Sequence, residues 1–363
     1  MLPAALSATL ATTETTAAPA VPTDHAALSV PATVLVMGAG AIGCYLAGRL
    51  QAAGVPVRCV GRARIVSDLH RHGLTLTDGD AAPLHLPPDT LDVGQTLDAA
   101  PAPALALLCV KSGATAEAAQ ALGAALPPGT PVVSMQNGVS NVAVARQGAP
   151  QLRWLAGMVP FNVAELGPGQ FHRGTAGQLA VQDDPALRAF GAAFARAGLP
   201  LQFHADLRAV QWGKLLINLN NPVNALSGQP LRAQLMQRGY RRCWAALQTE
   251  ALGVLRRAGI TPAQVVAVAP ARLPALLTLP SPVFRVLAAR MLRIDAQARS
   301  SMSDDLTRQR PTEIDALCGE VVRLAHGCGA RAPLNERMVA LVQTWPQRPV
   351  ALSPHEMLEA LGL

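Results

Sequence analysis

The sequence predicts a doubly wound α/β domain with a parallel sheet in its first half and an all-helical domain after about residue 205. Three observations support this. Short, β-branched apolar runs alternate with helical patterns, a glycine-rich turn joins the first such run to a helix, and after Asp206 the apolar spacing is mainly helical. The chain has 363 residues, about twice the usual length of one domain.

The first unit begins at Thr33–Met37, an apolar run typical of a buried parallel strand. A helical pattern from Ala41 to Ala53 ends at Gly54, and a second strand, Val55–Val60, follows. The intervening turn consists of Gly38, Ala39, Gly40, Ala41, Ile42 and Gly43. Such a turn lets a pyrophosphate approach the backbone at a helix N-terminus, so we expect dinucleotide binding here. The alternative is that these glycines serve only a tight turn.

The alternation continues along the first half. We expect strands at 104–110, 132–135, 178–182 and 200–204, helices at 114–126 and 185–197, and later a proline-rich loop at 273–282. Residues 1–30 are rich in Ala, Thr and Pro and lack a basic start, so we expect a disordered tail and neither a secretory signal nor a transit peptide. The predicted domains are therefore residues 31–205 and 206–363.

Composition excludes several classes of protein. The net charge of +7 comes from arginines spread along the chain, and two tyrosines and six phenylalanines offer few surfaces for base stacking, so we expect no nucleic-acid partner. The most apolar stretch, residues 273–292, contains three prolines and two arginines, which argues against a membrane span. Six cysteines without CxxC spacing favour neither a metal site nor disulfides. A reducing cytoplasm fits best.

Lysine is nearly absent from this chain. Of 30 basic residues, 28 are arginine, and only Lys111 and Lys214 are lysine. Arginine keeps its proton in proteins, whereas lysine can act as an acid or base, so these two residues are predicted to carry chemistry; the alternative is chance survival. Lys111 follows one strand at its carboxyl end, where doubly wound sheets bind ligands, and Asn137 follows the next. Taken alone, Asn137-Gly138 is more often just a turn.

The second strand ends in Val60-Gly61-Arg62, where NAD-specific folds usually carry an acidic residue for the ribose hydroxyl. Arg62, with Arg64 as a second candidate, suits the 2′-phosphate of NADPH. The alternative is a solvated surface arginine.

Three polar residues share one face of a predicted helix in the second half. Lys214, Asn218 and Asn221 stand at i, i+4 and i+7, which suits either a polar ligand or a buried polar network. Pro222 frees the carbonyl of Asn218 and is expected to bend the helix there.

Two further residues come later in the chain. Ser301 suits a helix cap, with Asp304 three residues on, about as well as a ligand contact. Glu313, after Pro311, suits either a site or an acid at a helix start.

Together these motifs resemble the ketopantoate reductase (2-dehydropantoate 2-reductase) family. The resemblance runs from Thr33 to the 340s and rests on motifs in this order: GAGAIG at 38–43, VK at 110–111, QNG at 136–138, WxKLxxN at 212–218, NP at 221–222, and SSM…TEID at 300–315. It implies a Rossmann domain, an all-helical domain, and reduction of ketopantoate to pantoate by NADPH in the cleft between them, as in pantothenate biosynthesis.

The resemblance also implies roles for individual residues. Lys214 would be the general acid, and Glu313 would hold the lysine or the bound cofactor and substrate. The residues implied to bind substrate are Asn218, Asn221, Ser301 and Asn137, and Lys111 and Asn137 would line the cofactor side. A shortened stretch after Asn218, Leu231 at a position where a polar residue is expected, and a long 273–292 segment leave the exact 2-oxo acid open. The alternatives are a related NADP-dependent reductase of another 2-oxo acid and a non-catalytic NADPH sensor. The oligomeric state also stays open, with a homodimer among the candidates.

Overall fold

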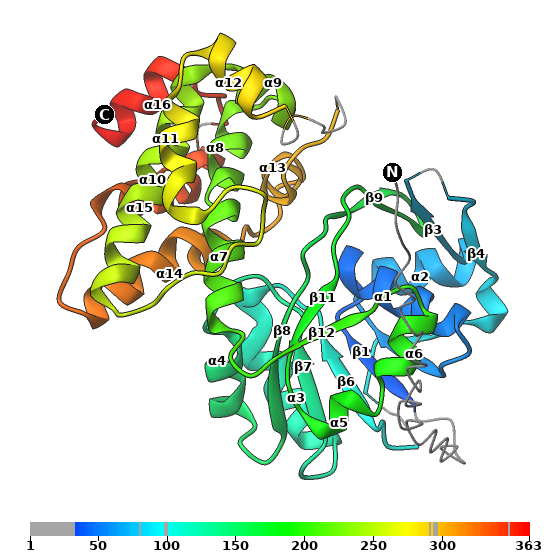
Figure 1. Ribbon diagram of the computed structural model, residues 1–363. Coiled ribbons are helices and arrows are strands. Elements are labelled where there is room, and N and C mark those ends of the chain that lie inside the picture. The colour runs from blue at the N-terminus through cyan, green and yellow to red at the C-terminus, as the bar shows by residue number, and fades with distance from the viewer. Residues whose placement is uncertain (1–32, 80, 98–100, 290–291, 293–296, 348) are drawn as a thin grey trace, which may run out of the picture. The chain divides into compact units, whose positions relative to one another are not determined.

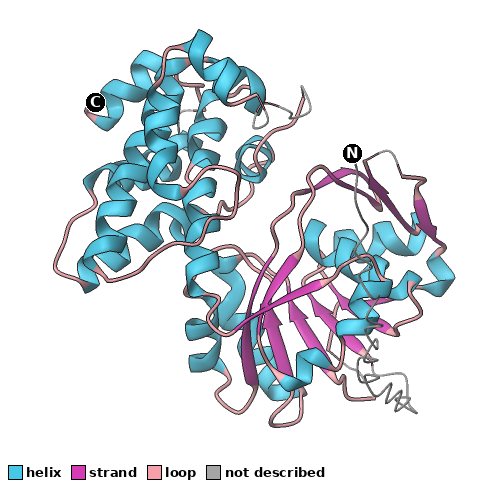
Figure 2. Cartoon of the chain, in the orientation of Figure 1, coloured by secondary structure: helices cyan, strands magenta, loops and turns pink. Residues whose placement is uncertain are grey.

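The computed structural model describes residues 33–79, 81–97, 101–289, 292, 297–347 and 349–363. The tail predicted at residues 1–30 lies outside these ranges. Ala32–Leu363 form one compact unit. Within the described part, every strand precedes Asp206 and only helices follow it (Figures 1 and 2).

The main sheet has eight strands among the described residues, in the order β12-β11-β8-β7-β6-β1-β2-β5. Neighbouring strands are parallel except for the antiparallel pair β8 and β11. The strands are β1 (Val34–Met37), β2 (Val57–Val60), β5 (Asp92–Gly94), β6 (Leu105–Leu108), β7 (Pro131–Ser134), β8 (Arg153–Met158), β11 (Leu179–Gln182) and β12 (Leu201–His204). The strand order reverses at β1, with β2 on one side and β6 on the other. In such sheets ligands bind at the carboxyl ends of the strands beside this reversal.

Both faces of this sheet are buried, which explains why its strands are continuously apolar. Along β6, Leu105 and Leu107 pack into the core with α1 (Ala41–Ala52), whereas Ala106 and Leu108 pack into the core on the opposite face. That opposite face is covered by α3 (Thr115–Ala125) and α4 (Asn141–Gly148). The predicted doubly wound class is confirmed by this arrangement.

Among the described residues there is also a four-stranded sheet, which was not predicted from the sequence. It has the order β4-β3-β10-β9 and contains β3 (Leu74–Asp78), β4 (Leu84–Leu86), β9 (Val163–Gly167) and β10 (Gln170–Arg173). Its strands are mostly half-buried and mix polar with apolar residues, so no continuous apolar run marks them. The helix α2 (Ala63–His72) and the short 3-10 helix η1 (Pro88–Thr90) lie in this part of the chain and were not predicted either.

The helices after Asp206 enclose a core of their own. They are α7 (Arg208–Asn218), α8 (Asn220–Ser227), α9 (Leu231–Met236), α10 (Arg238–Arg257), η3 (Pro270–Arg272), α11 (Leu273–Thr278), α12 (Ser281–Leu287), α13 (Ser301–Thr307), α14 (Ile314–Gly327), α15 (Pro333–Thr344), η4 (Trp345–Gln347) and α16 (Pro354–Leu361). The predicted all-helical second part is confirmed.

Two predicted elements were wrong. The helix expected at 185–197 is two short helices, α5 (Pro185–Arg188) and α6 (Gly191–Arg196). The loop expected at 273–282 contains α11 and the start of α12, because Pro274 and Pro282 stand in the first turns of these helices, where the missing N–H is tolerated. The buried guanidinium of Arg241 donates to the carbonyls of Leu277 and Leu279 at the end of α11.

Candidate functional site

The glycine turn between β1 and α1 has two positions that the protein itself requires to be glycine. Gly38 has φ of 112°, and a Cβ there would lie 2.6 Å from the backbone nitrogen of Val110. A Cβ on Gly43 would overlap the carbonyl oxygen of Gly38. A Cβ on the exposed Gly40, in contrast, would meet no protein atom within 4 Å. The space at the N-terminus of α1 is therefore open, as a site for a phosphate group requires.

A polar cluster forms where β6 and β7 end. Glu313, which precedes α14, accepts hydrogen bonds from the backbone nitrogen and the Oγ of Ser112, both at 3.1 Å, and from Nδ2 of Asn137 at 3.1 Å. Nδ2 of Asn218 donates to Oδ1 of Asn137 at 3.3 Å. Three of the sequence-predicted site residues, Asn137, Asn218 and Glu313, are thus joined directly.

Lys111 lies beside this cluster and binds the same stretch of chain. Its Nζ donates to the carbonyl of Pro311 at 2.9 Å and forms an ion pair with Asp305 of α13. Burial raises the pKa of Asp305, although Lys111 opposes that effect. Lys111 therefore connects the end of β6 to the segment that carries Glu313.

Lys214 is positioned by α7, one helical turn before Asn218. Its neighbours Gly213, Leu215 and Leu216 are buried. Its Nζ donates to the carbonyl of Pro160, just after β8, at 3.2 Å, so the amine lies near the end of the strand that pairs with β7. Burial lowers the pKa of Lys214 from 10.5 to about 8. An amine with such a pKa can give up its proton near neutral pH.

The helix that was predicted to bend near Pro222 is interrupted there. The regular helix ends at Asn218 and resumes at Asn220, with Pro222 in the first turn of α8. The carbonyl of Asn221 accepts a hydrogen bond from Oγ of Ser300, the residue before Ser301. The cap of α13 is Ser300, which accepts from the backbone nitrogen of Ser303, so the suggestion that Ser301 is the cap was wrong. Ser301 is exposed.

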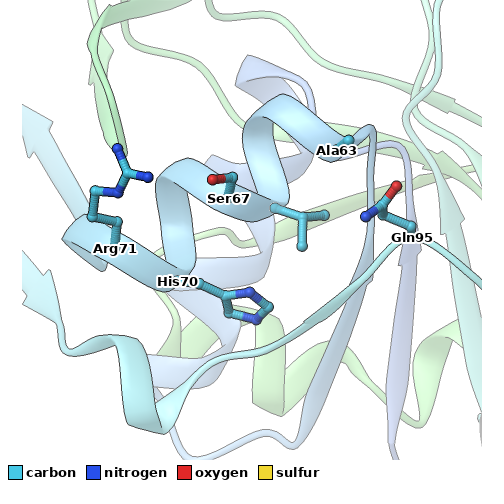
Figure 3. Close-up of a pocket in the computed structure, with 6 residues that line it drawn as sticks. Ala63, Ser67, His70, Arg71 and Gln95 are labelled. Carbon is cyan, nitrogen blue, oxygen red and sulfur yellow. The ribbon is translucent and has the colours of Figure 1, made fainter.

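Arg62 and Arg64 stand at the start of α2, after β2. Arg62 is exposed, whereas Arg64 binds Asp68 and Glu165. A surface pocket of about 430 Å³ lies along the same helix (Figure 3). Its lining consists of Ala63, Val66, Ser67, His70, Arg71 and Gln95. None of the residues predicted to form the site lines this pocket.

Four groups that hold predicted residues in place were not predicted from the sequence. Ser112 binds Glu313, Asp305 binds Lys111, the carbonyl of Pro160 binds Lys214, and Glu165 binds Arg64. Ser112 follows Lys111 directly, so its position after a strand was the one available signal. The other three are distant in sequence from their partners.

Two family models match this chain. The model described as Ketopantoate reductase PanE/ApbA matches residues 34–185, and the model of its C-terminal part matches residues 206–345. The chain belongs to the ketopantoate reductase PanE/ApbA family. This confirms the resemblance drawn from the motifs and the expected class of enzyme, a nicotinamide-dependent oxidoreductase.

Individual members of the family are distant relatives. The chain is 26% identical to the 2-dehydropantoate 2-reductase of Halobacterium salinarum, over 85% of this chain and 97% of that protein. The enzyme of the same name from Mesorhizobium japonicum is also 26% identical, with 85% and 96% covered.

Solved structures of other proteins share the fold. A PanE/ApbA family ketopantoate reductase from Ralstonia eutropha superposes with a TM-score of 0.74 at 27% identity and covers 87% of this chain and 99% of its own. D-mandelate dehydrogenase with NADH and anilino(oxo)acetate has a TM-score of 0.72 at 19% identity, with 86% and 97% covered, and supports the fold alone. No described helix combines the length and apolar character needed to cross a bilayer.

Proposed function

We propose that this protein reduces 2-dehydropantoate to pantoate with NADPH, and that Lys214 donates the proton. The observation that most supports this proposal concerns Lys214. Burial lowers the pKa of its amine to about 8, and the residue lies one helical turn before Asn218. We also keep the boundary between a cofactor domain and a substrate domain at residue 205.

Lys214 has the properties that ketone reduction requires. Hydride addition to a carbonyl leaves negative charge on its oxygen, which a nearby ammonium stabilises and then protonates. The burial that lowers its pKa also strengthens this attraction, because less water screens the charge.

The polar residues near Lys214 suit recognition of a small oxo acid. Asn137 and Asn218 are linked by one hydrogen bond, and each amide keeps further donors or acceptors for a polar substrate. Glu313 is held by Ser112 and Asn137, so its carboxylate is fixed in position. No described contact joins Glu313 to Lys214, and we therefore assign Glu313 to holding cofactor or substrate. Asn221 and Ser301, on neighbouring α8 and α13, complete the proposed substrate side.

The residues of the cofactor side fit NADPH. The cofactor supplies the hydride when bound. Gly40 leaves open space at the N-terminus of α1, where the backbone N–H groups of residues 40–43 can hold a pyrophosphate. Arg62 is exposed at the end of β2 and offers a cation for the 2′-phosphate, and Lys111 lies at the end of β6.

The decisive assay follows NADPH consumption with ketopantoate and with a panel of other 2-oxo acids. We expect ketopantoate to have the highest kcat/KM. Lys214→Ala should lower kcat at least about a hundredfold, the usual effect of losing a positioned general acid, with nearly unchanged NADPH binding. Lys214→Arg should also be poor, since a guanidinium keeps its proton. Unchanged turnover in Lys214→Ala would remove the lysine from the mechanism.

Repeating the assay with NADH tests the role of Arg62. We expect a clear preference for NADPH that Arg62→Ala reduces. Equal kcat/KM for the two cofactors in the wild-type protein would contradict it. A protein that binds NADPH but turns over none of the acids would instead be a sensor.

The oligomeric state of the protein can be measured on the same sample. A ketopantoate reductase from Staphylococcus aureus is described as dimeric. We propose a homodimer here, to be measured by light scattering, with a monomeric mass as the contrary result.

A further inference from the structure

The chain between α13 and α14 runs along the ends of the strands that carry the site. We call residues 308–313 the strap. At its far end Glu313 accepts hydrogen bonds from Ser112 and Asn137, and in its middle the carbonyl of Pro311 accepts from Lys111. The strap is therefore attached to the ends of both β6 and β7.

The near end of the strap is attached to a single residue, Glu165. On Glu165 of β9, Oε2 lies 3.2 Å from Nη1 of Arg308 and 3.5 Å from Nη1 of Arg310. Arg308 also donates from Nη2 to the carbonyl of Glu165 at 3.3 Å. The other carboxylate oxygen, Oε1, accepts from Arg64 of α2 at 2.7 Å. Glu165 thus lies between the strap and the start of α2.

The backbone of the strap is bent where the two arginines meet Glu165. Gln309 has φ of 51°, the one positive value among the described non-glycine residues. Two backbone hydrogen bonds close the end of α13 here. The N–H of Gln309 donates to the carbonyl of Leu306, and the N–H of Arg310 donates to the carbonyl of Asp305. A residue with a side chain disfavours this left-handed conformation, so the fold keeps this bend against an intrinsic preference. The bend accompanies the convergence of Arg308 and Arg310 on one carboxylate.

The approach of Arg308 and Arg310 to each other depends on the negative charge of Glu165. Its side chain is 14% exposed and is surrounded by the guanidinium groups of Arg64, Arg308 and Arg310. Burial alone would raise the pKa of Glu165, but the three arginines outweigh burial and hold it below its usual value. Without the carboxylate, the three cations would repel one another, and the near end of the strap would lose both ion pairs and keep only the bond from Arg308 to the backbone carbonyl of residue 165.

We propose that Glu165 is a positioning residue of the reductase reaction: by holding Arg308 and Arg310 it fixes the strap, and with it the carboxylate of Glu313. Glu165 itself is assigned no contact with substrate or cofactor. This inference rests on the proposed function, in which Glu313 belongs to the site.

The first test compares Glu165→Gln with Asp68→Asn. Each substitution converts a carboxylate that binds Arg64 into the corresponding amide. Only Glu165→Gln also removes the carboxylate that pairs with Arg308 and Arg310. At saturating substrate and NADPH we expect kcat to fall about tenfold in Glu165→Gln and to stay within about twofold of wild type in Asp68→Asn. Equal kcat in Glu165→Gln and wild type would overturn the proposal.

Ionic strength separates positioning by charge from a packing defect. Salt screens ion pairs between partly exposed groups, so wild-type kcat should fall as salt is raised, while kcat of Glu165→Gln should change little. Arg308→Gln should lower kcat as Glu165→Gln does, and the double variant should be no worse than either single one. Fully additive losses would contradict a shared role.

The role of Glu165 in holding the strap can also be tested without catalytic turnover. Amide hydrogen exchange in the ligand-free protein should be faster for residues 309–316 in Glu165→Gln than in wild type or Asp68→Asn. Unchanged exchange there would overturn the proposal even if kcat fell. If the wild-type protein reduced no 2-oxo acid, the proposed function would fail, and this exchange would still report whether Glu165 holds the strap.

Discussion

Replacing Lys214 by methionine should abolish activity and stabilise the folded protein. Burial of the amine lowers its pKa from 10.5 to about 8, although Lys214 as a whole is half-buried. At about 1.4 kcal/mol per pKa unit, keeping this amine charged costs the folded state about 3 kcal/mol near pH 7. Methionine removes that cost at similar length, but it also removes the hydrogen bond to the Pro160 carbonyl, worth about 1 kcal/mol. We expect a net stabilisation of about 2 kcal/mol.

The pH dependence of this stabilisation identifies its cause. Below pH 8 Lys214 is protonated in both the folded and the unfolded chain, so the whole cost is present. Between pH 8 and 10.5 the folded state has lost the proton and the unfolded state retains it, so the wild-type protein gains stability relative to the variant as pH rises. At about pH 9.5 the advantage of Lys214→Met should be close to zero.

Urea unfolding at pH 7 and at pH 9.5 measures the stability difference between Lys214→Met and wild type. The unfolding midpoints are compared with one common slope of unfolding free energy against urea concentration. Lys111→Met is the matched control, because that lysine is 41% exposed and paired with Asp305, so its loss should not stabilise the protein. A Lys214→Met variant that is no more stable than wild type at pH 7, or whose advantage persists unchanged at pH 9.5, would show that burial of a charged amine does not destabilise the fold.

Three further predictions concern the proton, the core and the glycine turn. With Lys214 as proton donor, kcat should decline as pH rises through about 8, and a pH profile that stays flat from 7 to about 9.5 would contradict that role. Arg241→Leu should destabilise the protein by about 3–5 kcal/mol in urea unfolding, since it strands several buried carbonyls; a loss below about 1 kcal/mol would show that they find other donors. Gly43→Ala should lower thermal stability without ligand, whereas Gly40→Ala should leave it unchanged and weaken NADPH binding about tenfold in a fluorescence titration; equal effects of the two variants would contradict the open space at Gly40.

The parts of the fold that could be predicted are those with a strong local pattern. The strands β1 and β6 are apolar without interruption because both faces of the main sheet are covered, and that pattern is legible in the sequence. The four-stranded sheet was missed because its strands are half-exposed and mix residue types, so neither a continuous run nor a strict alternation marks them. The segment at 273–282 was misread because proline signals a break only when it falls inside a helix, and here Pro274 and Pro282 begin helices.

Within the candidate site the same distinction separates what could be foreseen from what could not. The scarcity of lysine marked Lys111 and Lys214. Asn218 lies one helical turn after Lys214, and Asn137 follows a strand as Lys111 does, so composition and spacing along the chain were enough to single these residues out. Glu165 lies 101 residues from Arg64 and 143 from Arg308, and Ser112 lies 201 from Glu313. No periodicity connects residues so far apart, because their meeting depends on where β9 pairs and on how α13 ends. A carboxylate on a half-exposed strand reads as an ordinary solvated side chain until three arginines are found around it, which is why the interactions that hold this site in place had to come from the structure.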